Sequence, residues 1–287
     1  MYKSIVTEIV KRQKPKLLVI NASAFSQGNW NLTDEVYLRK WIDNMPMSQN
    51  KLDTVKTIPK NINKDDEKVK DNISDTLYFP LEKYHGNWKD PEAVYTSFVT
   101  RAYMRLSGGG YLKGFYSKTG ITGGRDNLAN IGQPTKEAYV LTDECRAYLK
   151  ELLSYCNKLG IEHVLLLQPP HETQAADKSG LEQIESITKE YGYDFLDLST
   201  DYESSVGIDD SHDFADFEHL NAYGAQKLSS YIGDMAVNQY GIKSDTAKSE
   251  LSRWKKSVKR TKKALKMARE YTDRGEAQVV GEYEAAK

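Results

Sequence analysis

The chain has 287 residues, of which 39% are hydrophobic and 28% are charged, and its formal net charge at pH 7 is −1. An apolar fraction of this size can bury a real core, and the length allows one large domain plus an extension. The balanced charge excludes a chain-wide basic character of the kind that indicates nucleic-acid binding. We therefore expect a globular protein with no nucleic-acid partner.

The N-terminal region predicts a helix, a strand, a turn and a second helix within residues 1–43. Apolar residues recur at helical spacing before residue 11, and the run 17–20 is a continuous apolar strand. Ser23 comes shortly after that strand. A serine in this position can be exposed at the carboxyl edge of a sheet, which is the geometry that a nucleophile needs.

The next part of the chain is mostly polar up to residue 91. Residues 50–74 are rich in lysine and aspartate and lack apolar periodicity, which predicts a polar surface insertion. Tyr84 and His85 form an aromatic cluster with Trp88 ahead of a helical segment at 91–106. Such a cluster predicts either a wall of a substrate cleft or a packing contact.

An α/β rhythm begins near residue 142. Helices predicted over 143–159 and 178–191 alternate with strands predicted over 163–167 and 194–198. This alternation indicates a parallel sheet whose strands are joined by right-handed crossovers. Ligands gather beyond the carboxyl ends of such strands, so we expect His171, just after the first of these strands, to line a cleft.

The segment 213–221 places Asp216 three residues before His219, ahead of a helix predicted to run to about residue 240. A carboxylate on one ring nitrogen of a histidine fixes its tautomer and leaves the other nitrogen free to take a proton from a hydroxyl group. The spacing thus predicts a general base. In one alternative, Asp216 caps the helix beside an ordinary histidine. In another, both bind a metal with His212 and Asp213, but the spacing matches no compact metal motif, so we expect no metal.

The same segment, Asp213-Phe214-Ala215-Asp216-Phe217-Glu218-His219-Leu220-Asn221 followed by Gly224-Ala225, resembles the C-terminal block of the SGNH/GDSL hydrolase superfamily. Earlier stretches, from Arg39 to Lys51 and from Phe79 to Trp88, resemble a bacterial branch related to cell-envelope acyl hydrolases and acyltransferases. The resemblance covers most of residues 1–243. It implies a flavodoxin-like three-layer α/β/α sandwich with a parallel sheet. We expect Tyr84, His85, His171 and Asn221 to line the substrate cleft.

The resemblance also implies the chemistry, which is ester hydrolysis or O-acyl transfer on an acylated glycan or cell-envelope polymer. A hydroxyl group would attack the ester carbonyl, while His219 takes the hydroxyl proton and returns it to the leaving alcohol, and Asp216 orients the ring. This chemistry requires no metal or organic cofactor. The alternative is a catalytically incomplete domain, or a fragment, that binds glycan or envelope polymer without turnover.

The nucleophile is the open question, because the Gly-Asp-Ser block that carries the family's serine does not occur in this chain. In one interpretation the chain starts downstream of the serine, so that the sheet lacks its first strand and the protein belongs to the cell envelope. In the other, 17–20 is the first strand and Ser23 is the nucleophile. Taken literally, a chain without a signal or transmembrane segment is cytoplasmic.

Residues 244–287 are expected to form a basic helical extension after the 1–243 domain. A helix predicted from about 248 to 271 either packs back by one apolar stripe or contacts a membrane surface or an anionic polymer. The stripe consists of Leu251, Trp254, Val258, Leu265 and Ala268.

Cys145 and Cys156 lie in one predicted helix, too far apart for a disulfide, and we expect two buried free thiols.

Overall fold

The structure is a computed structural model that describes residues 2–26, 39, 41–61, 77–78, 89–106, 110–121, 141–170, 179–216, 219–244, 247–282 and 284. Side chains at 59–61, 93, 97, 101 and 105 are outside this description. None of the helices within these ranges is long and apolar enough to cross a membrane.

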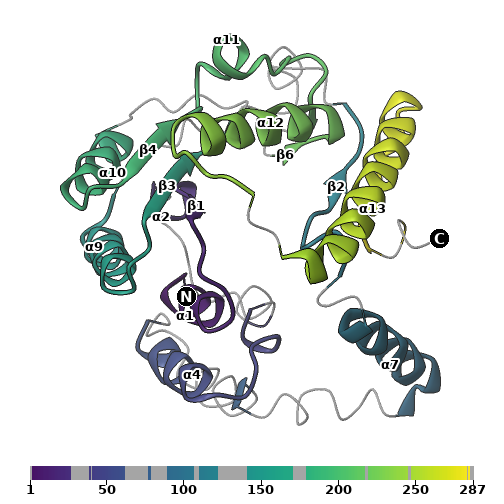
Figure 1. Cartoon of the computed structure of the whole chain (residues 1–287), viewed down its shortest axis with the longest axis horizontal. Helices are drawn as coiled ribbons and strands as arrows, with labels where there is room; N and C mark the ends of the chain where they lie inside the picture. Colours follow the sequence, from purple (N-terminus) through teal and green to yellow (C-terminus); the bar gives the residue numbers. More distant parts are fainter. Residues whose placement is uncertain are drawn as a thin grey trace.

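A three-stranded parallel sheet lies at the centre of the α/β part of the molecule (Figure 1). Strand β3 (His163–Gln168) lies between β1 (Leu17–Asn21) and β4 (Asp194–Asp197), and it pairs with both in parallel. Residues 164–168 of β3 are all buried, as expected for a continuous apolar strand covered on both faces. Among the described residues β1 is an edge strand, and Val19 in it is 40% exposed.

One face of the sheet is covered by the larger hydrophobic core. Four helices contribute to it: α1 (Tyr2–Val10), α2 (Ser23–Ser26), α9 (Asp143–Lys158) and α10 (Ser179–Glu190). Their buried side chains join Val164 and Leu166 of the central strand in one cluster. The buried side chains of the helices include Val6, Phe25, Leu149, Leu152, Leu153, Cys156, Leu181, Ile184 and Ile187.

The other face of the sheet carries a second core, which includes the helix after the predicted base. Leu167 of β3 belongs to this cluster because successive side chains of a strand point to opposite faces. Helix α11 (Tyr202–Val206) and helix α12 (Ala222–Asn238) pack here, α12 through Leu228 and Ile232. The predicted α/β class with a parallel sheet is therefore confirmed.

The predicted element boundaries in this half are close to those observed. Helices α9 and α10 are each followed by a glycine with a left-handed backbone, Gly160 at φ 67° and Gly192 at φ 76°. Glycine adopts this conformation without the steric cost of a Cβ atom, so it marks where each helix stops. Both cysteines are free, but only Cys156 is buried, whereas Cys145 is half-buried.

One expectation for the N-terminal half needs correction. Residues 49–61, which include the first part of the predicted polar insertion, form helix α4 (Gln49–Asn61), which packs against α1. Val55 is fully buried there because it forms a small core cluster with Ile42 and Leu77. Residues 62–74 lie outside the described part of the chain. The predicted helix at 91–106 is observed as α7 (Pro91–Leu106).

The C-terminal extension joins the body of the molecule instead of standing apart from it. Helix α13 (Lys248–Asp273) packs against α12, and the short strand β7 (Val279–Val280) pairs antiparallel with β2 (Ser117–Lys118). The predicted apolar stripe is only partly correct, since Leu251, Trp254 and Val258 are exposed. The buried side is made by Ser257, Ala264, Ala268 and Thr272.

Candidate active site

The candidate acid–base pair lies on a short hairpin just before α12. Strand β5 (Phe214–Asp216) pairs antiparallel with β6 (His219–Leu220), and the register places Asp216 opposite His219. Phe214 is fully buried against the ring of Tyr202, with ring centroids 5.7 Å apart, so it anchors one strand of the hairpin in the core. Burial of this anchor therefore fixes where the two polar side chains lie.

The two side chains are in direct contact. Nδ1 of His219 lies 2.7 Å from Oδ1 of Asp216, and the side chains are 42% and 34% exposed. No described residue makes a hydrogen bond to Nε2 of His219. The structure thus brings the predicted pair together in the predicted sense, with one ring nitrogen held by a carboxylate and the ring not sealed in the interior.

Asn221 has a different role from the one expected. It is fully buried, so the prediction that it lines a substrate cleft is wrong. Its Oδ1 accepts the backbone N–H groups of Tyr223 and Gly224 and caps α12, while its Nδ2 donates to the carbonyls of Gly120 and His212. The helix cap is therefore Asn221 and not Asp216, which also removes that alternative for Asp216.

Gly224 explains how closely α12 approaches the hairpin. A Cβ atom at this position would lie 2.5 Å from the carbonyl oxygen of Asp213 and 2.9 Å from the side chain of Leu220. Both distances are shorter than any normal contact, so only glycine fits without a shift of backbone. The glycine in the quoted motif is thus explained by packing at the start of the helix.

Lys118 is the site residue that sequence reasoning missed. Its Nζ lies 2.9 Å from Oδ2 of Asp216 and 3.1 Å from Nδ1 of His219. It precedes Asp216 by 98 residues, in a segment without any periodic or motif signal. A contact over this separation depends on how β2 is placed by its partner strand, which the local sequence does not encode.

A second histidine–aspartate pair lies beside the first. Asp213 is fully buried and accepts from Lys227 at 2.6 Å, from the backbone N–H of Asp209 at 2.8 Å and from His212 Nδ1 at 3.0 Å. Burial alone would raise the pKa of Asp213, but the hydrogen bonds from Lys227, Asp209 and His212 outweigh it and lower that pKa. This carboxylate is therefore a structural anion at the base of the hairpin.

The alternative of a metal cluster made by His212, Asp213, Asp216 and His219 finds no support in the described part of the chain. No group of three or more histidine, cysteine, aspartate or glutamate side chains with a metal-binding arrangement occurs there. The two histidines each pair with their own carboxylate instead.

Ser23 lies where the sequence predicted, immediately beyond the carboxyl end of β1. Its Oγ donates to Oδ1 of Asn21 at 2.7 Å, and the same oxygen accepts its backbone N–H. Within the described residues no hydrogen bond joins Ser23 to His219, and Figure 1 places α2 and β6 in different parts of the molecule. The other expected cleft residues, Tyr84, His85 and His171, lie outside the described residues.

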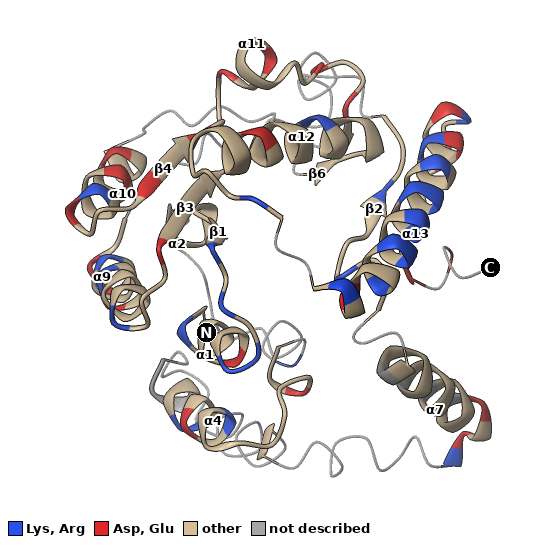
Figure 2. Cartoon of the chain, in the orientation of Figure 1, with Lys and Arg blue, Asp and Glu red and all other residues tan. Residues whose placement is uncertain are grey.

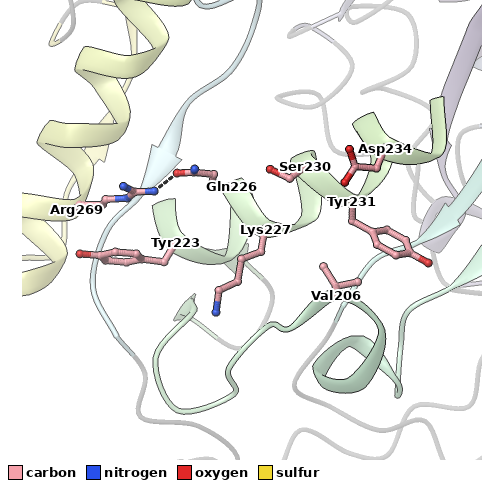
Figure 3. A pocket seen from close by; sticks show the side chains of 8 residues that line it. All are labelled: Val206, Tyr223, Gln226, Lys227, Ser230, Tyr231, Asp234 and Arg269. Carbon is pink, nitrogen blue, oxygen red and sulfur yellow. Dashed lines mark hydrogen bonds between the residues drawn. The ribbon is translucent and has the colours of Figure 1, made fainter. Parts of the chain in front are cut away.

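An open groove of about 450 Å³ runs along the outer face of α12 (Figure 3). Val206 of α11 and Arg269 of α13 line it from either side. Tyr223 is held in place because its hydroxyl donates to Asp273 and its ring lies under the guanidinium of Arg269. The α12 residues that line the groove are Tyr223, Gln226, Lys227, Ser230, Tyr231 and Asp234.

Searches of protein-family models, of curated proteins and of solved structures found no match to this chain.

Proposed function

We propose that this protein is an SGNH-type ester hydrolase or O-acyltransferase in which His219 is the general acid/base and Asp216 orients it. The observation that carries the proposal is the 2.7 Å contact between Nδ1 of His219 and Asp216, on a ring that is 42% exposed. An ionised carboxylate only accepts hydrogen bonds, so this contact places the proton on Nδ1. Nε2 then carries the lone pair that a base needs.

The reaction would proceed in two steps at that nitrogen. As a hydroxyl oxygen attacks the ester carbonyl carbon, its proton passes to Nε2 of His219 and a tetrahedral oxyanion forms. When the oxyanion collapses, the bond to the leaving alcohol breaks and His219 returns the proton to that alcohol. Asp216 stabilises the imidazolium between the two steps. Water as the second acceptor completes hydrolysis, and another alcohol completes acyl transfer.

Two candidates could supply the attacking hydroxyl group. Ser23 follows a strand of the parallel sheet, but its hydroxyl is turned to Asn21. The other answer is a serine that this sequence does not supply. The proposed flavodoxin-like fold is compatible with either, because β1 pairs directly with β3 and is an edge strand among the described residues.

The groove on α12 supports an acylated carbohydrate as the substrate class. The ring of Tyr231 offers a flat apolar face, and Ser230 and Asp234 offer hydrogen-bonding groups beside it. Asp213 compensates the charge of Lys227, and the described lining holds one further cation, Arg269, and one carboxylate, Asp234, so the charge of the groove does not favour a polyanion over a neutral polyhydroxyl chain. From Tyr223 to Asp234 the helix rises about 16 Å, so the groove suits an extended chain rather than one small molecule.

The function is tested with p-nitrophenyl acetate and an O-acetylated oligosaccharide as substrates. We expect His219→Ala to lose ester hydrolysis by about 10²-fold or more, since general acid–base catalysis contributes roughly 10²- to 10⁴-fold. His163→Ala, at the far end of β3, is the control and should keep full activity. Equal rates for the wild type and His219→Ala would contradict the proposal. Ser23→Ala decides the nucleophile, because only a catalytic Ser23 makes that variant inactive.

The second candidate function is carbohydrate binding without turnover. It is favoured by one observation, the orientation of the Ser23 hydroxyl toward Asn21 and not toward His219. In that case the wild type would show no hydrolysis, while an oligosaccharide would still perturb the NMR signals of Tyr223 and Tyr231. Loss of that binding in Tyr231→Ala, with Tyr95→Ala as a control on exposed α7, would locate the site.

We also propose that α13 contacts an anionic membrane surface. Lys and Arg dominate this helix (Figure 2), and the exposed Leu251, Trp254 and Val258 lie beside them at spacings of three and four residues. A basic helix with an exposed apolar stripe is typical of interfacial binding. Sedimentation with phosphatidylglycerol vesicles should retain the wild type and lose Trp254→Ser. Equal binding of both, or equal binding to phosphatidylcholine vesicles, would contradict this contact.

A further inference from the structure

We infer that Lys118 is a positioning residue that clamps Asp216 and so fixes His219, and that the C-terminal segment 247–282 holds Lys118 in place. The catalytic consequence of this inference rests on the proposed function, but the clamp itself does not. It would make the basic C-terminal segment part of the active site.

The clamp is visible in how the Asp216 carboxylate is shared. Oδ1 contacts the ring nitrogen of His219 at 2.7 Å, and Oδ2 contacts the Lys118 ammonium at 2.9 Å. A carboxylate that is bonded at both oxygens to different donors cannot rotate without losing one of the bonds. Lys118 therefore keeps Oδ1 directed at the imidazole, although it touches no reacting atom itself.

The direct approach of Lys118 to His219 is consistent with the same assignment. Nζ of Lys118 lies 3.1 Å from Nδ1 of His219, which by itself permits a hydrogen bond to an unprotonated Nδ1. Such a bond would leave two acceptors, Nδ1 and Oδ1 of Asp216, only 2.7 Å apart. Two donors that share the oxygens of one carboxylate must lie close together, so the 3.1 Å approach follows from the clamp.

Strand β7 determines where Lys118 lies. It pairs with β2 so that Val279 lies opposite Lys118 and Val280 lies opposite Ser117. Ser117 is buried, and alternation along the strand directs Lys118 to the opposite side, toward the hairpin. The pairing with the C-terminal segment thus sets the orientation of the lysine.

Hydrogen bonds outside the β2–β7 pair also attach the loop that follows Lys118 to the C-terminal segment. Thr119 exchanges backbone and side-chain bonds with Gln278, and its Oγ1 also donates to the carbonyl of Glu276. The backbone N–H of Gly120 donates to Oγ1 of Thr272 on α13. On the other side, the carbonyl of Gly120 accepts from the buried Asn221. The loop that carries Lys118 is therefore fixed to both the C-terminal segment and the start of α12.

The clamp is tested on the full chain by NMR of its ¹⁵N-labelled histidines. In the wild type we expect a resolved, ¹⁵N-coupled Nδ1 proton signal for His219, because Asp216 protects that proton from exchange. Lys118→Met should broaden or abolish this signal, and Lys118→Arg should restore it. Lys256→Met, on the exposed face of α13, is the matched control. A Nδ1 proton signal that is unchanged in Lys118→Met would overturn the inference.

The role of the C-terminal segment is tested with Thr119→Val, which keeps the shape of the side chain and the backbone bond to Gln278 but removes the side-chain hydrogen bonds to Glu276 and Gln278. We expect it to weaken the His219 signal as Lys118→Met does, whereas Thr188→Val, a buried threonine in α10, should not. An unchanged signal in Thr119→Val would remove the C-terminal segment from the inference.

The kinetic readout separates this inference from the proposed function. Lys118→Met should lower kcat roughly tenfold, which is a part of what general acid–base catalysis contributes. Because Lys118 does not touch substrate in this inference, KM should stay within about twofold of the wild type. An inactive wild type whose His219 signal still depends on Lys118 would refute the function and leave the clamp intact. A raised KM at constant kcat would instead show that Lys118 binds substrate.

Discussion

Replacing Asn221 by alanine should destabilise the protein without acting on substrate directly. The structure assigns this buried side chain three tasks: it caps α12, and it donates to the carbonyls of Gly120 and His212. Loss of the cap costs about 1 kcal/mol. Leaving the carbonyls of the buried Gly120 and the half-buried His212 without these donors costs about 1 kcal/mol each, at the low end of the usual range. The expected loss in the free energy of unfolding is therefore about 3 kcal/mol.

The assay is urea unfolding followed by circular dichroism, with Asn221→Ser beside Asn221→Ala. Serine keeps an oxygen that can cap the helix but cannot donate to both carbonyls, so it should cost about 2 kcal/mol, the carbonyl part alone. Asn238→Ala, at the exposed C-terminal end of the same helix, is the control and should stay within about 0.5 kcal/mol of the wild type. If Asn221→Ala unfolds like the wild type but loses substrate binding, the structural reasoning is refuted and the expected cleft role returns.

Gly224→Ala should destabilise the folded protein by about 1–3 kcal/mol, the usual cost of overpacking, because the new Cβ would meet the Asp213 carbonyl. The midpoint of urea unfolding measures this loss, and an unchanged midpoint would contradict the close packing. Asp213 has a lowered pKa, so the stability it contributes is present above its unfolded pKa near 4 and is lost as the pH falls through the lower folded value. Unfolding measured from about pH 6 down to pH 2 should therefore depend less on pH in Asp213→Asn than in the wild type, and parallel curves would argue against this assignment. Burial raises the pKa of Cys156 to about 11. In a Cys145→Ser background the remaining thiol should therefore react with a disulfide reagent at pH 8 only after the protein unfolds. Rapid reaction of the folded protein would show that the core around Cys156 opens.

The sequence predicted those parts of the fold that local patterns encode. Apolar periodicity and the terminating glycines gave α9, β3, α10 and β4 to within one or two residues, because each element buries one continuous face. The contact between Asp216 and His219 was also predictable, since both side chains lie on one tight hairpin.

The remaining features depend on contacts between distant segments. Lys118 reaches Asp216 through the pairing of β2 with β7, and neither two-residue strand has a sequence signal of its own. Asn221 is the last residue of the predicted motif, yet its burial depends on the loop at Gly120, about 100 residues earlier in the chain. Helix α4 was missed because its polar residues outnumber the few apolar ones, such as Val55, that pack inward.

The central claim is that Asp216 holds the Nδ1 proton of His219 and leaves Nε2 as the base. The most direct test is the ¹⁵N chemical shifts of the His219 ring in the folded chain, recorded where the ring is neutral. The account predicts a protonated Nδ1 and an unprotonated Nε2. A proton on Nε2, with Nδ1 bare, would contradict it, because the exposed nitrogen could then accept no proton from a hydroxyl group.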